Sequence, residues 1–251
     1  MVLKDEFKRI NRATGKPFTQ GYQDEHGRIF YSYVNKIGND GWYLEEWKKD
    51  KEAFNAKKSK ENNEWCTKNI THRNSHRNLI SPAPSREEME LIYQAALRAP
   101  DHAWLRPSSF IEIQGDSLKK LSNAFKGYAK DYIKDVSEEK LNKFIQAPFR
   151  APMIIVLVNT PKEHAMVPEI EQIMSTAAAA QNILLALNSL GYGGIWRTGT
   201  FALNEKVNSY LELKENQKIL GYIYAGTPDG EAKKIPEMNV EDFVTRWNIN
   251  E

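Results

Sequence analysis

The sequence predicts an α+β domain preceded by a small N-terminal module. Three patterns indicate the domain: an amphipathic helix capped at Ser85, a continuous apolar run at residues 153–158, and a long helix rich in small residues at 168–190. Helical and strand patterns therefore alternate within one stretch of the 251-residue chain. Hydrophobic residues make up 41% of the chain, which is enough for a buried core.

The N-terminal module begins with a predicted β-hairpin. Residues 27–34 combine Ile, Phe, Tyr and Val, and this composition favours a strand. An Asn-Asp-Gly turn signal at 39–41 follows, and the apolar run at 42–44 predicts the second strand of the hairpin.

The composition changes near residue 66. A polar helix is expected over about 45–60, and the Lys-, Asn- and Glu-rich stretch at 58–71 is typical of a linker. A module of this size buries little surface by itself. We therefore divide the chain into an accessory module at 1–66 and a main domain at 67–251.

The main domain begins with a helix whose two ends are marked in the sequence. Ser85 and Glu88 form a capping box, in which the serine hydroxyl accepts a backbone N–H and the glutamate reaches back to the serine N–H. Pro100 ends this helix, and Gly191 is positioned to end the long helix. The other predicted elements are a strand at 110–113, amphipathic helices at 117–125 and 137–146, a strand buried on both faces at 153–158, and a last central strand at 219–226.

Composition excludes several classes of protein. Cys66 is the single cysteine, which rules out an internal disulfide and a thiolate zinc site. No apolar run approaches the roughly 20 residues of a membrane span, and the N-terminus lacks the apolar core of a signal peptide. The sequence contains no glycine-rich nucleotide fingerprint and no His/Cys metal cluster. We expect a cytoplasmic protein without a membrane anchor or a metal site.

The net charge of +2 arises in the first 66 residues, which carry 13 Lys and Arg against 11 Asp and Glu. The remainder carries 22 of each. The lysines between residues 48 and 60 leave open a nucleic-acid-binding role for the module, although a solvated helical linker is the better explanation, because a charge balance this small makes no strong field.

Two segments combine side chains that suit an anionic ligand. The Arg-Asn-Ser triplet at 73–75 offers a guanidinium fork and a hydroxyl, both of which bind phosphate oxygens. Arg98 and His102 flank Pro100, and Arg98, in the last helical turn, also complements the helix dipole. If each segment is considered alone, an ordinary surface loop explains the triplet at 73–75 equally well, and an ordinary loop histidine explains His102.

A third segment follows the long helix. The glycines at 193–194 let backbone approach a ligand closely, and Trp196, Arg197 and Thr198 follow them. A core tryptophan beside a surface cation is the alternative interpretation.

Together, the segments at 71–75 (Thr-His-Arg-Asn-Ser), 98–102 (Arg-Ala-Pro-Asp-His) and 193–199 (Gly-Gly-Ile-Trp-Arg-Thr-Gly) resemble the FMN-dependent nitroreductase family, in particular its short bacterial NAD(P)H nitroreductase branch. The resemblance spans about residues 67–251 and implies a central mixed sheet flanked by helices. It implies FMN as cofactor, NADH or NADPH as co-substrate, and these cofactor-binding residues: Arg73, Asn74, Ser75, Arg98, His102, Trp196, Arg197 and Thr198.

The resemblance also implies the reaction and the assembly. NAD(P)H delivers hydride to flavin N5, and an electron-poor acceptor such as a nitroaromatic or a quinone then takes the electrons. No side chain need act as an obligatory base, so no catalytic residue is assigned. The helix at 168–190 corresponds to the centre of an intertwined homodimer with each flavin at the subunit interface.

The chain departs from the family pattern at two places. The family usually has Arg-Arg-Ser where this chain has Asn74, so one cation is missing, and Arg77 or His76 are candidates to compensate. The Leu-Arg-Pro-Ser stretch at 105–108 replaces the more widespread Gln-Pro-Trp, which leaves the substrate side of the pocket undefined.

The resemblance further implies a nicotinamide-cofactor region, although a helix C-terminus repels anions. Its residues are Ala186, Leu187, Asn188, Ser189, Leu190 and Gly191. Two other functions stay open: a nucleic-acid- or protein-binding adaptor that works through residues 1–66, and a flavin enzyme of another reaction, of the dehalogenase or flavin-cleaving type.

Overall fold

The computed structural model describes residues 64–231 and 233–247 and four short strands nearer the N-terminus. These strands are β1 (Ile10–Asn11), β2 (Lys16–Pro17), β3 (Gly21–Gln23) and β4 (Ile29–Tyr31). The chain divides into two units, Met1–Asn63 and Glu64–Glu251, and each is described by itself.

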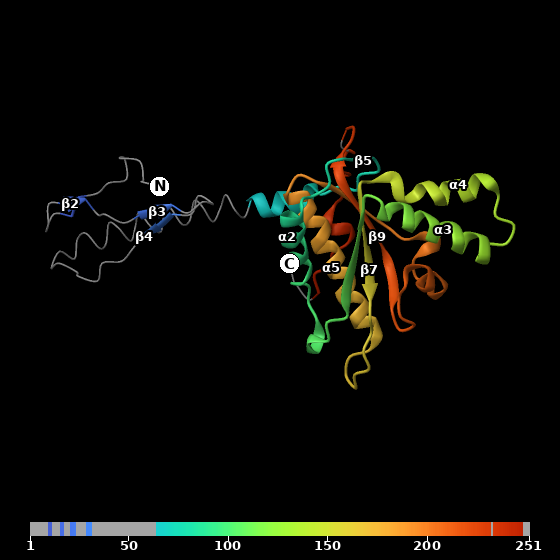
Figure 1. Ribbon diagram of the computed structural model, residues 1–251. Coiled ribbons are helices and arrows are strands. Elements are labelled where there is room, and N and C mark those ends of the chain that lie inside the picture. The colour runs from blue at the N-terminus through green and yellow to red at the C-terminus, as the bar shows by residue number, and fades with distance from the viewer. Residues whose placement is uncertain are drawn as a thin grey trace. The chain divides into compact units, whose positions relative to one another are not determined.

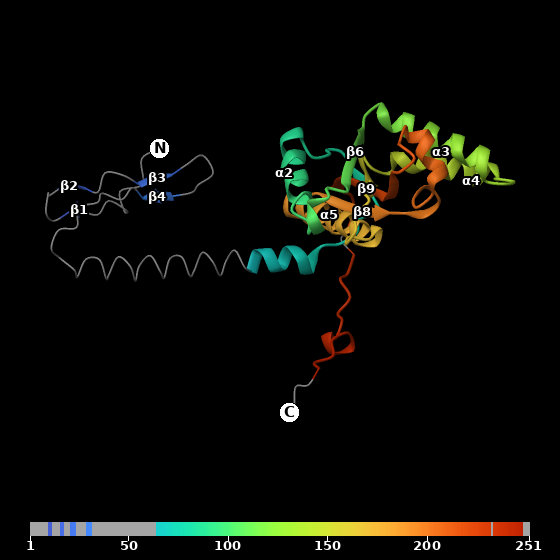
Figure 2. The same cartoon turned by 90° about the horizontal axis from the view of Figure 1, so that it is seen from below.

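In the first unit, β1 pairs with β2 and β3 pairs with β4, both antiparallel (Figures 1 and 2). Strand β4 lies inside the strand predicted at 27–34, and its observed partner is the upstream β3, with Phe30 opposite Tyr22. The predicted turn at 39–41, second strand at 42–44 and helix at 45–60 lie outside the described residues.

Residues 64–72 are helical, so the linker prediction is wrong for 64–71. Tertiary contact explains the difference. The Asn69 side chain donates to the Leu185 carbonyl at 3.1 Å, and the Asn188 amide donates to Asn69 Oδ1 at 2.6 Å. Polar side chains that suggest a linker thus attach this helix to the end of the long helix.

The main sheet has five strands: β5 (Leu79–Ile80), β6 (Ser108–Gln114), β7 (Met153–Asn159), β8 (Gly193–Arg197) and β9 (Lys218–Pro228). Strand β9 pairs with β5, β7 and β8, and β6 pairs with the other edge of β7. These pairings are antiparallel, and a single parallel bridge joins Ser75 to Gly194. Every residue of β7 is buried, which confirms the strand predicted from the apolar run.

Helices cover both faces of the sheet, which confirms the α+β fold. α2 (Arg86–Ala96) and α5 (Glu169–Ser189) pack on one face, and α3 (Ser117–Tyr132) and α4 (Glu138–Gln146) pack on the other (Figures 1 and 2). Alternate residues of β7 and β9 enter the two cores, since Ile223 faces α5 while Tyr222 and Tyr224 face α3.

Local signals set the start of α2 and the end of α5 as the sequence predicts, whereas α2 ends at Ala96, before the predicted stop at Pro100. The Ser85–Glu88 capping box is present at the start of α2. At the end of α5, Gly191 has φ +83°, and the N–H groups of Gly191 and Tyr192 donate to the carbonyls of Asn188 and Leu187. This pair of bonds is a Schellman motif.

α2 and α5 run antiparallel, and side-chain contacts mark their register. The Tyr192 hydroxyl, just past the end of α5, donates to Glu88 near the start of α2 at 2.9 Å. Asn182, in the middle of α5, donates to the Ala95 carbonyl near the end of α2 at 3.0 Å.

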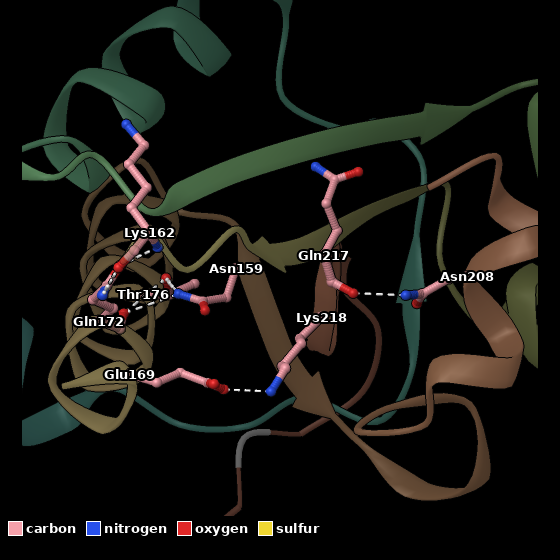
Figure 3. Close-up of polar contacts among 8 residues, drawn as sticks. All are labelled: Asn159, Lys162, Glu169, Gln172, Thr176, Asn208, Gln217 and Lys218. Atoms are coloured by element: carbon pink, nitrogen blue, oxygen red, sulfur yellow. Dashed lines mark hydrogen bonds and ion pairs between the residues drawn. The ribbon is translucent and has the colours of Figure 1, made fainter. Parts of the chain in front are cut away.

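A buried polar network attaches the start of α5 to the sheet (Figure 3). Asn159, at the end of β7, donates to the Gln172 carbonyl at 3.0 Å and to Thr176 Oγ1 at 2.8 Å. An ion pair between Glu169 and Lys218 connects the same end of the helix to β9.

The segment that follows β9 leads away from the sheet (Figure 2). Residues 233–247 are exposed, and they include six large apolar side chains: Ile235, Met238, Val240, Phe243, Val244 and Trp247. Within the described residues, no helix has the length and apolarity to cross a membrane, and no cluster of His, Cys, Asp and Glu could hold a metal ion.

Candidate cofactor site

The Arg-Asn-Ser triplet lies beside β8. Ser75 forms the parallel bridge to Gly194, and the His76 N–H donates to the Gly194 carbonyl at 3.3 Å. Two of the three sequence-predicted segments, 73–75 and 193–199, are therefore neighbours in the fold.

Asn74 holds a third segment against this pair. Its Nδ2 donates to the Lys233 carbonyl at 2.7 Å, and its Oδ1 accepts the Ser75 N–H at 2.9 Å. The asparagine thus has a structural role, and it brings Lys233 to the triplet.

The charges around His76 are positive. Burial lowers the pKa of His76, and the nearby Lys233 and Arg73 lower it further. Arg73 Nη1 is buried and has no hydrogen-bond partner among the described residues. We call Arg73, Ser75, His76 and Lys233 the first cluster; its donor types suit a phosphate.

Trp196 has a structural contact on the α5 face of the sheet. Its Nε1 donates to the Leu220 carbonyl at 3.2 Å, at the point where the pairing of β9 with β7 shifts register. The indole crosses Gly221, which has φ +146°; a Cβ at that position would lie 2.1 Å from Trp196 Nε1. The glycine is therefore required by both conformation and space.

Arg197 points to the opposite face, because successive strand residues alternate. It pairs in register with Tyr222, and its Cζ lies 5.4 Å from the centre of the Tyr224 ring. Burial lowers the pKa of Arg197, and the like charges of Arg150 and Arg77 add to this effect. Arg197 Nε is buried without a hydrogen-bond partner in the described part of the chain.

Two adjoining cavities share Arg150 and Arg197. The first, of about 580 Å³, is lined by Arg77, Asn78, Leu79, Ile80, Arg150 and Arg197. The second, of about 430 Å³, lies between β9 and the helices α3 and α4; its aromatic lining residues are Phe125, Phe144, Phe201, Tyr222 and Tyr224.

We call Arg77, Arg150 and Arg197 the second cluster. None of the three forms an ion pair with a carboxylate of the described residues.

Thr198 lines the second cavity and is exposed. It follows Arg197 at the end of β8, so the Trp-Arg-Thr triplet is divided between the two faces of the sheet and the end of the strand.

Arg98 and His102 lie elsewhere. α2 ends at Ala96, so the placement of Arg98 in the last helical turn is wrong; its N–H donates to the Ala95 carbonyl in the turn that follows. His102 Nδ1 lies 2.7 Å from Glu171 Oε2 at the start of α5.

The first cluster, by contrast, neighbours the helix at 64–72, which contacts Asn188 near the end of α5. At 1.5 Å per residue, the 17 residues from Glu171 to Asn188 span about 25 Å. A single copy of the chain therefore does not bring together all the residues implied by the resemblance.

The residues predicted for nicotinamide binding form the end of α5. Leu187 is fully buried, the Asn188 amide donates to Asn69, and the Ser189 hydroxyl donates to the Ala186 carbonyl. Leu190 and Gly191 complete the Schellman cap. These side chains are used in packing and capping, and the assignment stays a prediction.

Three residues at the clusters were not assigned from the sequence. Arg150 lies in a segment, 148–152, that the sequence indicates only as the entry to a buried strand. The sequence signal that could have identified Arg150 is its position: it is a cation only three residues before the apolar strand β7 begins at Met153. The lysines at 233–234 follow the last strand and are candidates for a phosphate contact, although the sequence favours a solvated lysine there, and Tyr224 gave no local signal; long-range packing brings Lys233 and Tyr224 to the site.

The arrangement can bind an anionic ligand with two charged ends. Donors of the first cluster suit a phosphate, and the second cluster with its aromatic wall suits a planar ring that carries negative charge. The paired glycines of β8 are buried: a Cβ on Gly193 would lie 2.7 Å from Leu79, and a Cβ on Gly194 would lie 2.9 Å from Leu184, so these glycines make room for side chains of the core.

Comparison with known proteins agrees with this chemistry. The family model described as "Nitroreductase family" matches residues 70–227. A curated Escherichia coli K12 protein named as the NAD(P)H nitroreductase YdjA is 36% identical over 180 residues, which cover 70% of this chain and 96% of that protein.

Solved structures share the fold. A nitroreductase-like family protein from Bacillus cereus matches with a TM-score of 0.63 and 20% identity, over 73% of this chain and 96% of that one. A nitroreductase with bound FMN from Bacteroides fragilis matches with a TM-score of 0.58 and 20% identity, over 72% and 97%.

Proposed function

The chain belongs to the nitroreductase family, and from that premise we propose that it is an FMN-dependent NAD(P)H oxidoreductase that reduces electron-poor acceptors such as nitroaromatics or quinones. The observation that supports this most is the pair of positively charged clusters at β8, each with a buried guanidinium nitrogen that lacks a partner among the described residues.

The residues present fit FMN. Arg73, Ser75 and Lys233 would hold the phosphate, because a buried guanidinium and a hydroxyl lie together there. Arg77 and Arg197 would face the ring, where positive charge favours the reduced, anionic form. Bound FMN supplies the reversible transfer of hydride that the reaction requires.

Arg98 and His102 support a homodimeric site. They lie along α5 at a distance from the first cluster, so a second copy would have to supply them to complete the set of cofactor contacts. In this arrangement each site takes its phosphate-binding residues from one copy and Arg98 and His102 from the other.

Exposed apolar residues supply a surface for such a dimer. Ile170 and Met174, one turn apart on α5, are 55% and 61% exposed, and Trp104, in the loop after α2, is 77% exposed. The apolar segment at 235–247 adds a further surface. Exposed patches of this kind favour association.

The overall reaction balances without an additional reductant. NAD(P)H gives up a hydride, and one proton comes from water; a nitro group becomes a nitroso group with loss of one water molecule, and a quinone becomes a hydroquinone. The protein holds the reactants in contact, and because water supplies the proton, no side chain has to act as an obligatory acid or base.

The division into an accessory module at 1–66 and an FMN-binding domain at 67–251 is part of this proposal, as is a cytoplasmic location. The start of the family match at residue 70 supports the division.

The test is an anaerobic titration. Purified protein is mixed with FMN, desalted, and scanned in the visible range before and after addition of NADPH or NADH. The proposal predicts close to one retained flavin per chain and loss of the oxidised-flavin bands on addition of the nicotinamide. Protein that retains no flavin after desalting would refute it.

A further inference from the structure

Asn74 stands where the family pattern has a cation, and both polar atoms of its side chain bond to the backbone of the protein. Its Nδ2 donates to the Lys233 carbonyl at 2.7 Å, and its Oδ1 accepts the Ser75 N–H at 2.9 Å. These partners fix the orientation of the amide, because a flipped side chain would set its oxygen against a carbonyl and its nitrogen against an N–H. Asn74 therefore acts on two other members of the first cluster, Ser75 and Lys233.

The contact between Asn74 and Lys233 continues the antiparallel register of β5 and β9. Just past these strands, the Asp229 N–H donates to the Asn78 carbonyl at 3.1 Å. Four residues further along each of the two segments, the Asn74 side chain donates to Lys233. An amide side chain thus supplies a bond that a regular ladder would take from the backbone, and it holds the backbone of Lys233 at a defined place beside the triplet.

Lys233 adds a positive charge to the first cluster. Burial lowers the pKa of His76, and the charges of Lys233 and Arg73 lower it further, so both cations lie near one imidazole. Arg73 Nη1 is buried and has no hydrogen-bond partner among the described residues, which leaves this donor for a ligand. The chain therefore places two cations at the triplet, as many as the Arg-Arg-Ser pattern of the family, although one of them comes from the segment after β9.

We propose that Asn74 is a positioning residue for the cofactor phosphate: it holds the backbone of Lys233, so that this lysine supplies the cation that the family pattern has at position 74. Asn74 itself does not contact the phosphate. The inference rests on the proposed function, because it concerns the cofactor of that same site. The bond goes to the Lys233 carbonyl, so removal of the lysine side chain leaves the bond in place, whereas removal of the Asn74 amide releases the lysine.

Two flavins separate binding of the phosphate from binding of the ring, since riboflavin lacks the phosphate. Fluorescence titration measures the Kd of FMN and of riboflavin for the wild type, Asn74→Ala and Lys233→Ala. The proposal predicts that each substitution weakens FMN roughly tenfold and changes riboflavin by less than about twofold. The matched control Lys234→Ala removes the next exposed lysine and should change neither.

Three results of this titration would overturn the proposal. Equal losses for FMN and riboflavin in Asn74→Ala would indicate a general disturbance of the site. Unchanged FMN affinity in either Asn74→Ala or Lys233→Ala would remove that residue from the phosphate site. Lys233→Ala and Lys234→Ala alter only exposed side chains, so this pair keeps the proposal testable if Asn74→Ala does not fold.

The double variant tests whether Asn74 acts through Lys233. Once the lysine side chain is absent, loss of the Asn74 amide should have little further effect, so Asn74→Ala/Lys233→Ala should bind FMN about as tightly as Lys233→Ala alone. If the two losses multiply instead, Asn74 acts by another route, such as its bond to Ser75, and the proposal is wrong.

The exchange of cations has its own test. Asn74→Arg in the Lys233→Ala background returns a guanidinium to the position where the family has one, and it should restore most of the lost FMN affinity while riboflavin is unaffected. No gain would contradict the exchange.

The two proposals fail separately. Wild-type protein that retains no FMN refutes the proposed function. Wild-type protein that retains FMN and is bleached by the nicotinamide, but whose Asn74→Ala variant binds FMN equally well, refutes only the positioning role of Asn74.

Discussion

His102 Nδ1 lies 2.7 Å from Glu171 Oε2, which fixes the loop after α2 to the first turn of α5. The Arg-Asn-Ser triplet lies instead beside Gly194, just past the other end of α5. The length of this helix therefore separates the residues that the family resemblance groups into one site. This separation is the reason we propose a site shared between two copies of the chain.

Arg73 is expected to bind the cofactor phosphate. Arg73→Ala should weaken FMN binding by roughly 1.5–3 kcal/mol, about 10- to 100-fold, because a charge-assisted contact is lost. Fluorescence titration of FMN measures the change, with Arg86→Ala as the exposed control. Unchanged affinity in Arg73→Ala would remove this arginine from the site.

Gly221 should tolerate no side chain. In Gly221→Ala, the new Cβ would meet the Trp196 indole at 2.1 Å in a backbone conformation that L residues avoid, so we expect a loss of about 2–4 kcal/mol in urea unfolding.

The control for this substitution is Gly115→Ala. Gly115 also has positive φ, but a Cβ added there would meet no atom within 4 Å, so the loss should stay near ~1 kcal/mol. If the two variants lose the same free energy of unfolding, the contact between the new Cβ and Trp196 does not contribute to the destabilisation of Gly221→Ala.

The network in Figure 3 should stabilise the start of α5. Thr176→Val removes the acceptor of the buried Asn159 amide while keeping the shape of the side chain, and should cost about 1–3 kcal/mol. Urea unfolding measures the loss, and the exposed Thr67→Val serves as the control. A loss no larger than that of the control would mean that the network contributes no net stability.

His76 should make the protein less stable in mild acid. Because its folded-state pKa lies below the usual value, the unfolded chain binds the proton more readily, and stability falls as the pH drops through the ordinary range of histidine, near 6.5. Thermal unfolding between pH 7.5 and 5.5 should therefore show a larger decrease in Tm for the wild type than for His76→Asn. Parallel decreases in the two proteins would contradict this role.

Much of the fold follows from local signals in the sequence. The capping box at Ser85, the apolar run of β7 and the glycine at 191 each act through their nearest neighbours along the chain, so helix ends and the buried strand could be predicted. The helix at 64–72 could not, since Asn69 is held by residues more than a hundred positions away.

The site was predictable only in part. The three motifs indicated which side chains are candidates for cofactor binding, but neither spacing nor composition reveals that His102 lies at one end of α5 and Ser75 at the other. The order of the strands brings Arg150 to the second cluster, and the hydrogen bond from Asn74 brings Lys233 to the first. Both are long-range features of the fold.

The shared site is tested most directly by subunit complementation. Arg73→Ala and Arg98→Ala chains carrying different affinity tags are coexpressed, and the mixed dimer is purified through both tags. One of its two sites then contains both substitutions and the other contains neither, so the account predicts about half of the wild-type flavin content and NADPH-dependent reduction. The matched control pairs wild type with the double variant Arg73→Ala/Arg98→Ala, which leaves no intact site and should be inactive. Equal flavin content and activity in the two mixed dimers would contradict a site built from both copies.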